Sequence, residues 1–587
     1  MSQSIEKAAR DDVSRNNLQT HIEYFCSLGE KLAGSDEEIK ACDYIVSQLA
    51  AVGIEARVYE FEAFVSHPGP ARVTTFFPEK MSIEAVGISF SVSTPAEGLS
   101  AEIVFVGNGA AKDYQGLDVR GKIVLVNAKP RPENVVMAAQ QGAVALIGMS
   151  EGKALHKLIA SPVWGIPSLK DKGKIPRIPV ASISGDAGAI LRRLAKAGTL
   201  KGTVITEMWE GWKTLHLPVA EIPGSRPEFI LCGGHYCSWW EGATDNATGN
   251  SCLIELARIL KKNQKALRYG IRLAWWPGHS NGRYAGSAWY ADTFWQELYD
   301  NGIVYLNIDS PGVKGATVYA PRHQMAEISE FNESTVAELT KWSTVTTPEV
   351  QLAHGRAGKY VSPTRPPRAG DQSFCNIGLT SIGVYGMLPA GHPDRGTVGG
   401  SGGAWWWHSK YDTIDKADAD ILAQDTRLYV SLLLRLATIS VLPFNFAASA
   451  QDYLDALREY QEESGDALPF QSLMEILALL KEKASALHAQ ARNLENEEDT
   501  GRLNRLYLSL ARTLNPPLYT SNEPFEFQPA VPAHLVPDLE QALKLKKMAP
   551  DSNDVKFLLT ELKRKINKIN FHLVTAIRLI DSWKASR

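Results

Sequence analysis

Four short apolar runs between residues 214 and 445 constrain the fold of this chain more than any other feature. The runs occupy residues 229–232, 271–276, 303–308 and 380–385. A helical stripe of Leu253, Leu256 and Leu260 lies between the first two runs. Uninterrupted apolar runs of this length are typical of strands buried on both faces, and strands that alternate with helices indicate an α/β sheet.

The rest of the chain divides into regions that differ in their pattern of apolar, Gly and Pro residues. Residues 88–213 contain short β-rich runs separated by Gly and Pro, without a cluster of acidic, His and Cys side chains, which indicates an accessory module. After residue 446 the pattern is helical, because a leucine recurs every seven residues from Leu473 to Leu494. The predicted domains are residues 1–87 together with 214–445, an insert of residues 88–213, and a helical domain of residues 446–587.

Charge, apolar runs and cysteine content limit the function classes. The net charge of -3 over 587 residues argues against a nucleic-acid partner, which usually requires a basic face. The most apolar run, residues 429–447, is broken by Arg435 and Pro443, so we expect no membrane-spanning helix and no membrane partner. The N-terminus lacks the apolar core of a signal peptide, and the six cysteines are scattered. We therefore expect free thiols and a cytoplasmic protein.

Side chains of the metal-ligand type follow the predicted strands. In strand order, these residues are His235, Cys237 and Asp245, then His279, then Asp309, and finally His408. Ligands of an open α/β sheet gather at the carboxyl ends of the strands, and many metal sites draw their ligands from separate loops. The joint pattern therefore predicts a metal site at this edge of the sheet.

Each of these residues also has a purely structural interpretation. Asp245 is placed to cap the helix that starts soon after it, and Cys237 is typical of a small buried hydrophobe. Asp309 fits a turn, and His408 fits a core histidine among tryptophans. Only the matched positions after successive strands favour a metal site over a metal-free α/β protein.

Sequence blocks along most of the chain carry a family resemblance. The stretch GGHYCSWWEGATDNATGNSCLIELARIL has ten positions from His235 to Asp245, and NGRYAGSAWYAD, LNID and WHSKYDT follow it. DVRGKIVLVNAK, AAQQGAVALIG and IPVASISGDAG lie earlier, in the predicted insert. These blocks resemble the co-catalytic zinc aminopeptidases, a family that includes glutamate carboxypeptidase and the transferrin receptor. The insert resembles the family's protease-associated domain, and the C-terminal helices are similar to its helical dimerisation domain.

The resemblance implies a fold, a ligand set and an assembly. The implied fold is a zinc-aminopeptidase-like α/β mixed sheet flanked by helices, with a β-rich protease-associated insert and a C-terminal helical domain that forms a homodimer. His235, Asp245 and Asp309 would bind one metal ion, and Asp245 would bridge to a second ion bound by His408. The Asp245–Asn246 peptide bond would be cis. The expected cofactor is one or two divalent ions, zinc first, with iron and manganese as alternatives.

The chain departs from the family pattern at two places. Where the family has His-x-Asp, this chain has Cys237, which either binds the metal as a thiolate or lies behind the ligands. Where the family has a Glu-Glu pair, a general base followed by a metal ligand, this chain has His279-Ser280. His279 then either replaces the lost ligand or acts as the general base.

Aromatic and cationic side chains near the predicted site bear on the substrate. Trp239, Trp240 and Trp407 are candidates to wall a pocket, and Arg356 is a candidate to receive a carboxylate, although a solvated loop also explains it. We predict a divergent metal-dependent hydrolase that cleaves an amide or peptide bond, of a small molecule or a peptide, with a metal-activated water. The alternative is a catalytically inactive, peptidase-like binding or scaffold protein, because both glutamates are lost.

Overall fold

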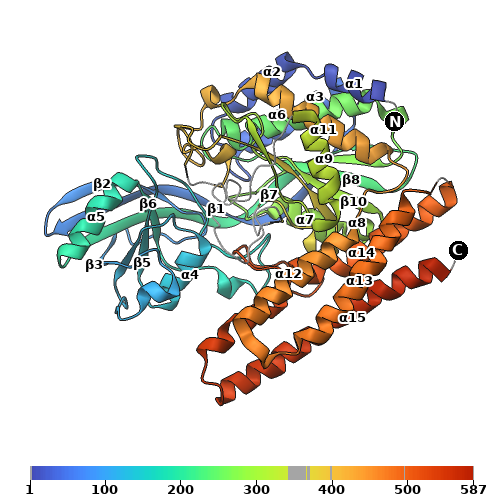
Figure 1. Cartoon of the computed structure of the whole chain (residues 1–587). Helices are drawn as coiled ribbons and strands as arrows, with labels where there is room; N and C mark the ends of the chain where they lie inside the picture. The colour runs from blue at the N-terminus through green and yellow to red at the C-terminus, as the bar shows by residue number, and fades with distance from the viewer. Residues whose placement is uncertain (1–2, 341–364, 367–369, 397–398, 495, 586–587) are drawn as a thin grey trace.

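The computed structural model describes residues 3–340, 365–366, 370–396, 399–494 and 496–585. Within these residues, an 11-stranded mixed sheet has the strand order β1-β2-β6-β5-β4-β3-β7-β9-β8-β10-β12. Figure 1 shows a helix-covered main lobe, a smaller β-rich lobe and a group of long C-terminal helices. The predicted α/β fold class is therefore confirmed.

The main lobe is built on four parallel strands. Their order across the sheet is β9 (Gly270–Trp276), β8 (Phe229–His235), β10 (Gly302–Asn307) and β12 (Thr380–Ile382). Successive residues of β8 face opposite sides, since Ile230 packs into one hydrophobic core and Leu231 into another. Both faces are therefore buried, which explains why the sequence runs are apolar without alternation.

The fourth predicted run, residues 380–385, does not form a single strand. It splits into β12, which pairs with β10, and β13 (Val384–Met387), which pairs with β11 (Val318–Pro321) in a separate two-stranded sheet. At the break, the carbonyl of Gly383 accepts hydrogen bonds from the Arg322 N–H and from Asn332 Nδ2, each at 3.0 Å. Both halves remain buried, so apolar character alone does not reveal the division.

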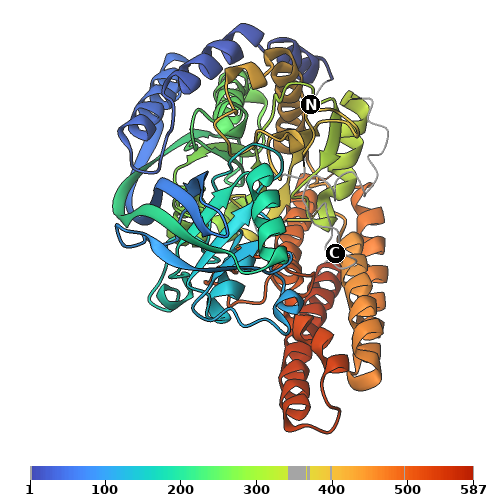
Figure 2. The same ribbon diagram turned by 90° about the vertical axis from the view of Figure 1, so that its left-hand side faces the viewer.

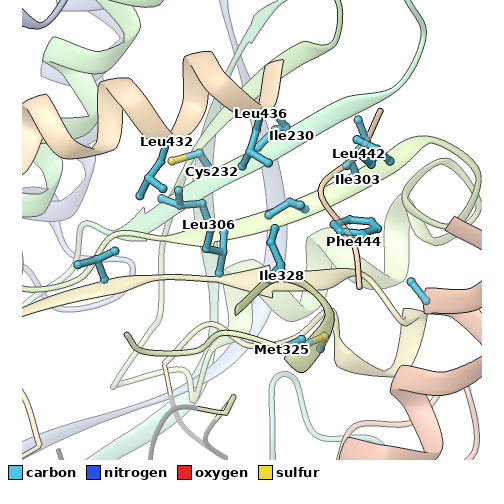
Figure 3. Packing of buried hydrophobic residues seen from close by; sticks show 14 of the residues in the cluster. Ile230, Cys232, Ile303, Leu306, Met325, Ile328, Leu432, Leu436, Leu442 and Phe444 are labelled. Atoms are coloured by element: carbon cyan, nitrogen blue, oxygen red, sulfur yellow. The ribbon is translucent and has the colours of Figure 1, made fainter. Parts of the chain in front are cut away.

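Helices cover both faces of the parallel strands. One core contains side chains from α1 (Gln3–Asp11), α2 (Arg15–Ser27), α3 (Asp36–Ala51), α6 (Thr248–Lys262), α9 (Ser329–Thr340) and α11 (Ala419–Thr438). The other core contains side chains from α7 (Ala285–Thr293) and α8 (Trp295–Asn301). Figure 3 shows the first core, where Cys232 of β8 and Leu306 of β10 pack near Leu432 of α11.

Two long antiparallel strands, β1 (Ala56–Phe77) and β7 (Lys201–Ile222), run from the main lobe into the smaller lobe. The smaller lobe contains β2 (Met81–Gly87), β3 (Leu99–Phe105), β4 (Ile123–Val126), β5 (Ala145–Met149), β6 (Val180–Ile183), α4 (Pro132–Gln140) and α5 (Gly185–Ala197). Figure 2 views the molecule from the side of this lobe. The insert is thus continuous with the main sheet.

The C-terminal region is helical, as the leucine repeat predicts. The described part contains α12 (Phe446–Ser464), α13 (Phe470–Ala491), α14 (Glu497–Tyr519) and α15 (Asn553–Ala585). Leu473, Leu480 and Leu487 of the heptad pattern are buried along α13, which contacts both α12 and α15. The leucines of the heptad pattern are therefore buried by helices of the same chain, and the homodimer stays a prediction.

Two further expectations concern the thiols and the membrane. No disulfide joins Cys26, Cys42, Cys232, Cys237 or Cys252. Within the part of the chain that the structure describes, no helix combines the length and the apolar character needed to cross a membrane. The cytoplasmic location stays a prediction.

The N-cap of α3, Ser35, lies beside a buried acid, Glu38. Ser35 Oγ accepts the Glu38 N–H at 3.2 Å, and Glu38 Oε2 accepts the Gly34 N–H at 2.6 Å. Glu38 is 0% exposed, and its Oε1 has no hydrogen-bond partner. Burial raises the pKa of Glu38 to about 8, although the N–H groups of Gly34 and Gly278 oppose the rise.

We expect Glu38→Gln to stabilise the protein at alkaline pH. The folded-state pKa lies above the ordinary value of 4.5, so wild-type stability falls as the pH rises from about 4.5 to about 8. Gln keeps an acceptor for the Gly34 N–H and carries no charge. The free energy of unfolding of Glu38→Gln at pH 9 is therefore expected to exceed that of the wild type by about 2–5 kcal/mol. Urea unfolding at pH 5 and pH 9 measures this difference, with the neighbouring Glu37→Gln as control. An equal pH dependence in wild type and Glu38→Gln would contradict this assignment.

Candidate metal centre and active site

The predicted ligand residues meet at the carboxyl edge of the parallel strands. His235 is the last residue of β8, and Asp309 lies two positions after β10. Asp245 lies in the helical turn of residues Ala243–Ala247, between β8 and α6, and its bond to Asn246 is cis as expected. His279 follows β9, and His408 lies in the loop before α11. The structure therefore brings together the side chains that the strand positions predicted to converge.

A buried His–Asp–His arrangement forms the centre of the site. His235 Nε2 lies 3.0 Å from Asp245 Oδ1, and His408 Nε2 lies 3.0 Å from Asp245 Oδ2. His235 Nε2 is also 4.0 Å from Asp309 Oδ1. One carboxylate thus lies between two imidazoles, which is the arrangement expected of a bridging ligand.

The hydrogen bonds on the far side of each imidazole define which nitrogen faces Asp245. His235 Nδ1 lies 2.9 Å from the Cys237 carbonyl, and His408 Nδ1 lies 2.9 Å from the Lys157 carbonyl. Carbonyl oxygens only accept, so each Nδ1 donates a proton and each Nε2 is left to face a carboxylate oxygen. An imidazole Nε2 with a lone pair does not bind a carboxylate oxygen, which is also an acceptor. A positive charge is therefore needed between the two atoms, either as a second proton on the imidazole ring or as a cation.

The electrostatics of the three groups favour positive charge at this place. Burial by itself lowers the pKa of His235, but the side chains of Asp245 and Cys237 outweigh it and raise that pKa well above its ordinary value. Burial raises the pKa of Asp245, but hydrogen bonds to His235 and His408 hold it well below its ordinary value. Burial lowers the pKa of His408 in spite of Asp245. A second proton on His408 is thus disfavoured, which leaves the Nε2 lone pair of His408 available to a cation.

The donor set fits a divalent ion. One ligand atom each from His235, His279 and Asp309 lie within 4.8 Å of one another. The His235 and His279 rings stack with their centroids 3.9 Å apart. Imidazole nitrogens with carboxylate oxygens are the usual ligands of zinc and similar ions. His235, His279 and Asp309 therefore form a candidate ligand cluster, and Asp245 and His408 adjoin it.

Cys237 contacts the His279 loop. Its Sγ accepts the His279 N–H at 3.2 Å, and the sulfur is not among the ligand atoms that cluster with His235. At the position where the family has the Asp of His-x-Asp, Cys237 thus holds His235 Nδ1 through its backbone carbonyl. In this arrangement the thiol positions the loop of His279 behind the ligands.

His279 has a carboxylate partner that the sequence did not indicate. His279 Nδ1 lies 2.7 Å from Asp371 Oδ2, and Ser287 Oγ donates to Asp371 Oδ1 at 2.9 Å. Burial alone raises the pKa of Asp371, but His279 outweighs it and holds the pKa below its ordinary value. Asp371 is therefore an ionised, fully buried acceptor that fixes the His279 ring.

The cavity beside these groups is small, about 160 Å³. Trp407 lines it and stacks on His408 at 3.5 Å, while Trp239 meets the His408 ring edge-on at 4.7 Å. Trp240 instead lies under the Lys157 ammonium at 4.3 Å and packs with the Trp239 cluster. Arg356, predicted to receive a carboxylate, lies outside the described residues.

The sequence analysis did not identify three residues of the site. Asp371 bonds His279, and Arg283 and Arg322 line the cavity. Asp371 lies in a Gly-Asp-Gln stretch nine positions before β12, with no motif around it. Arg283 lies four positions after His279, in the loop between β9 and α7. Arg322 directly follows the short strand β11, which no apolar run of the predicted sheet indicated.

The sheet with ligand-type residues at its carboxyl edge, the inserted β-lobe and the helical tail define a zinc-aminopeptidase-like protein with a protease-associated insert. Comparison with known families agrees: residues 219–432 match the peptidase family M28, and residues 98–191 match the PA domain. Residues 219–432 are thus similar to M28 peptidases, and the PA-like region lies before them in the chain. The resemblance predicted from the sequence is confirmed.

Curated relatives match about half of the chain. Carboxypeptidase Q of Xenopus laevis is 29% identical, over 45% of this chain and 59% of the relative. The probable glutamate carboxypeptidase VP8 of Zea mays is 24% identical, over 50% of each chain. This chain thus spans between half and three fifths of the length of these relatives.

Solved structures support the fold. The aminopeptidase from Aneurinibacillus sp. strain AM-1 has a TM-score of 0.53 at 21% identity, covering 74% of this chain and 96% of that chain. A peptidase M28 precursor from Shewanella amazonensis has a TM-score of 0.55 at 20% identity, covering 75% and 96%. At these identities the likeness defines the fold alone.

Proposed function

We propose that the protein is a metal-dependent hydrolase that cleaves an amide or peptide bond. The observation that carries the proposal is the buried Asp245 carboxylate, with an imidazole Nε2 3.0 Å from each of its oxygens. The M28 match and the carboxypeptidase and aminopeptidase names of the similar proteins support a peptide-bond hydrolase.

The residues divide into holders of the ion and groups that act on the substrate. His235, Asp245, Asp309 and His408 would hold one or two divalent ions, zinc first. When bound, such an ion polarises a substrate carbonyl and makes water a stronger nucleophile at neutral pH. The Cys237 and Lys157 carbonyls keep His235 and His408 in the tautomer that presents Nε2.

His279 takes the place of the family's general base in this proposal. Asp371 accepts a hydrogen bond from the His279 Nδ1–H, so Nε2 carries a lone pair that accepts a proton from the attacking water. The same nitrogen then donates this proton to the leaving amine. Asp371 is held by Ser287, which keeps the acceptor and the ring in one orientation.

The cavity favours a short substrate. Typical small-molecule sites measure about 300–1,000 Å³, and this cavity measures about 160 Å³. Trp407 forms one wall of it and supplies an apolar face beside His408. A dipeptide or an N-acylated amino acid suits this space better than an extended peptide.

The test is hydrolysis of a panel of dipeptides, aminoacyl amides and N-acyl amino acids by the purified full-length chain. We expect activity that disappears after treatment with a chelator and returns when zinc, iron or manganese is added back. A chelator saturated with zinc beforehand is the control for chelator effects unrelated to metal removal. A protein with full metal content that cleaves nothing in the panel would favour the inactive binding or scaffold alternative.

A further inference from the structure

A second cavity, larger than the one beside the metal centre, lies where three parts of the chain meet. Its volume is about 880 Å³, and its walls come from α4 and the segment 162–177 of the insert, from Asp292 of α7 and from residues 522–529 of the C-terminal region. Sites for small molecules typically measure about 300–1,000 Å³. The size of this cavity is therefore that of a small-molecule site.

The two cavities are separate. Among the described residues, they share no lining residue. Hydrogen bonds join the segments between them: the Ala530 N–H donates to the Pro162 carbonyl at 2.7 Å, and the Gly165 N–H donates to the Arg283 carbonyl at 2.6 Å. Pro162 lines the larger cavity, whereas Arg283 and Ala530 line the smaller one. A molecule in the larger cavity therefore lies on the far side of these joined segments from the metal centre.

The lining of the larger cavity is rich in apolar side chains that the fold covers only in part. These side chains include Trp164, Ile166, Leu169, Ile175, Phe525 and Phe527. Leu169 is 91% exposed and Phe525 is 70% exposed, while Trp164 is 6% exposed. Exposed apolar side chains around a hollow mark a binding site, because a ligand that covers them removes apolar surface from water.

The charges of the lining leave one acid unpaired. Each basic residue of the lining has an acidic partner: Lys170 pairs with Glu526 at 2.8 Å, Lys174 with Asp171 at 2.9 Å and Arg177 with Glu210 at 2.6 Å. In the part of the chain that the structure describes, no basic side chain forms an ion pair with Asp292. The cavity therefore has room for one positive charge from a ligand.

The position of Asp292 favours a cation further. Asp292 is the penultimate residue of α7, where the helix dipole attracts positive charge. The residue is exposed, but partial desolvation in the concave wall raises its pKa to about 6. At pH 7.5 the carboxylate is still ionised, and an ammonium group would relieve its incomplete solvation.

Trp164 connects the larger cavity to His279 through a chain of hydrogen bonds. Its Nε1 donates to Ser373 Oγ at 2.9 Å, the hydroxyls of Ser373 and Ser287 are 2.8 Å apart, and Ser287 donates to Asp371 at 2.9 Å. Each hydroxyl has one proton, so Ser373 donates to Ser287 and every bond of the chain points toward Asp371. Asp371 in turn holds His279 Nδ1 at 2.7 Å.

Ring contacts form a second connection between the same two residues. The Trp164 and Tyr284 rings lie 4.3 Å apart, and Tyr284 meets the His279 ring edge-on at 4.9 Å. A ligand that packs on Trp164 favours one position of the indole. Because the indole contacts both Ser373 and Tyr284, a change in its position reaches the His279 ring by two routes.

We propose that the larger cavity binds an aromatic molecule with one ammonium group, and that its occupancy is transmitted to His279 through Trp164. The aromatic ring of the ligand would pack against Trp164 and Phe525, and its ammonium group would pair with Asp292. This inference goes beyond the proposed hydrolysis, because the ligand is an effector that binds away from the metal centre and is not the substrate.

The test of binding is calorimetric titration of the full chain at pH 7.5 with tryptamine and with tryptophol, which has a hydroxyl in place of the ammonium group. We expect tryptamine to bind with a Kd on the order of 0.1–1 mM. Tryptophol should bind about 10-fold more weakly or less, because it lacks the charge-assisted hydrogen bond. Asp292→Asn should weaken the binding of tryptamine by about 10–100-fold and leave that of tryptophol unchanged.

Two control variants locate the site. Asp300→Asn should bind tryptamine as the wild type does, since Asp300 is an exposed acid of α8 outside the cavity lining. Asp245→Asn should also bind it normally, because Asp245 belongs to the metal centre. Equal affinities for tryptamine and tryptophol, no binding of either, or an unchanged affinity in Asp292→Asn would overturn the proposal. If Asp292→Asn is not folded, the comparison of the two compounds in the wild type decides.

The transmission to His279 is measured by nuclear magnetic resonance of the full chain labelled with ¹³C at histidine Cε1. The His279 signal is assigned by its absence from His279→Gln. We expect tryptamine to shift this signal and to leave that of His488, on α13, in place. Ser373→Ala should bind tryptamine normally, since Ser373 does not line the larger cavity, but should show a smaller shift. Binding of tryptamine without a shift of the His279 signal would overturn the transmission.

Both measurements are independent of turnover, so they support or overturn this inference even if the proposed hydrolysis fails. If the protein does hydrolyse an amide, tryptamine should change kcat and should not compete with the substrate. Purely competitive inhibition would instead place tryptamine at the metal centre and would overturn the effector site while leaving the hydrolase proposal intact.

Discussion

Asp245→Asn is expected to remove bound divalent metal from the purified protein and to reduce amide hydrolysis on the order of 10³-fold, because metal polarisation supplies several kcal/mol to the transition state. Asn has the same shape but no charge, and it replaces one of the carboxylate oxygens with an NH₂ donor. The amide therefore cannot bridge two imidazole nitrogens in the way that the Asp245 oxygens do, 3.0 Å from each Nε2.

Elemental analysis of the dialysed protein, with and without added zinc, measures the first part of this prediction. Circular dichroism and the unfolding temperature establish that Asp245→Asn is folded. Asp420→Asn is the control, because Asp420 is an exposed acid paired with Arg15 on the surface, where an ion pair contributes little. If Asp245→Asn retained the metal content and activity of the wild type, the His–Asp–His centre would not be the metal site.

His279→Gln is expected to lower kcat by about 10²–10⁴-fold while the metal content stays unchanged, because the variant loses the group that accepts the proton from water. Asp371→Asn should lower kcat in the same direction by a smaller factor. Its amide no longer requires Nδ1 to be the protonated nitrogen, so the imidazole loses its fixed orientation. KM should change little in either variant.

The outcome for His279 decides between the two roles that its sequence position left open. Loss of one ion per chain in His279→Gln would make this histidine a ligand and would contradict the general-base role. An unaltered kcat would exclude both roles. His488→Gln on α13 is the matched control, since that histidine bonds the Phe444 carbonyl far along the chain from the site.

Much of the site follows from strand positions in the sequence. His235, His279 and Asp309 each lie within three residues of the end of a parallel strand, so their convergence follows from the geometry of any such sheet. The apolar runs that predict these strands are continuous because both faces are buried. A local pattern and one general rule therefore predict this part of the site.

Other parts of the site depend on contacts between distant segments. Asp371 meets His279 across 92 positions of sequence, and the Lys157 carbonyl of the insert meets His408 across 251. No periodicity or spacing encodes such pairs, because each segment is an irregular loop whose path is defined by its surroundings. For the same reason, the sequence pattern does not predict the role of Cys237, whose sulfur and carbonyl contact two different histidines.

By itself, the sequence determined the α/β class and which residue types stand at the strand ends, because these properties depend on local apolar periodicity and on order along the chain. Only the tertiary structure decided that Asp371 orients His279, that the fourth apolar run divides at Gly383, and that Arg283 and Arg322 line the cavity. Those outcomes depend on which loops meet and which polar atoms the packing leaves unsatisfied.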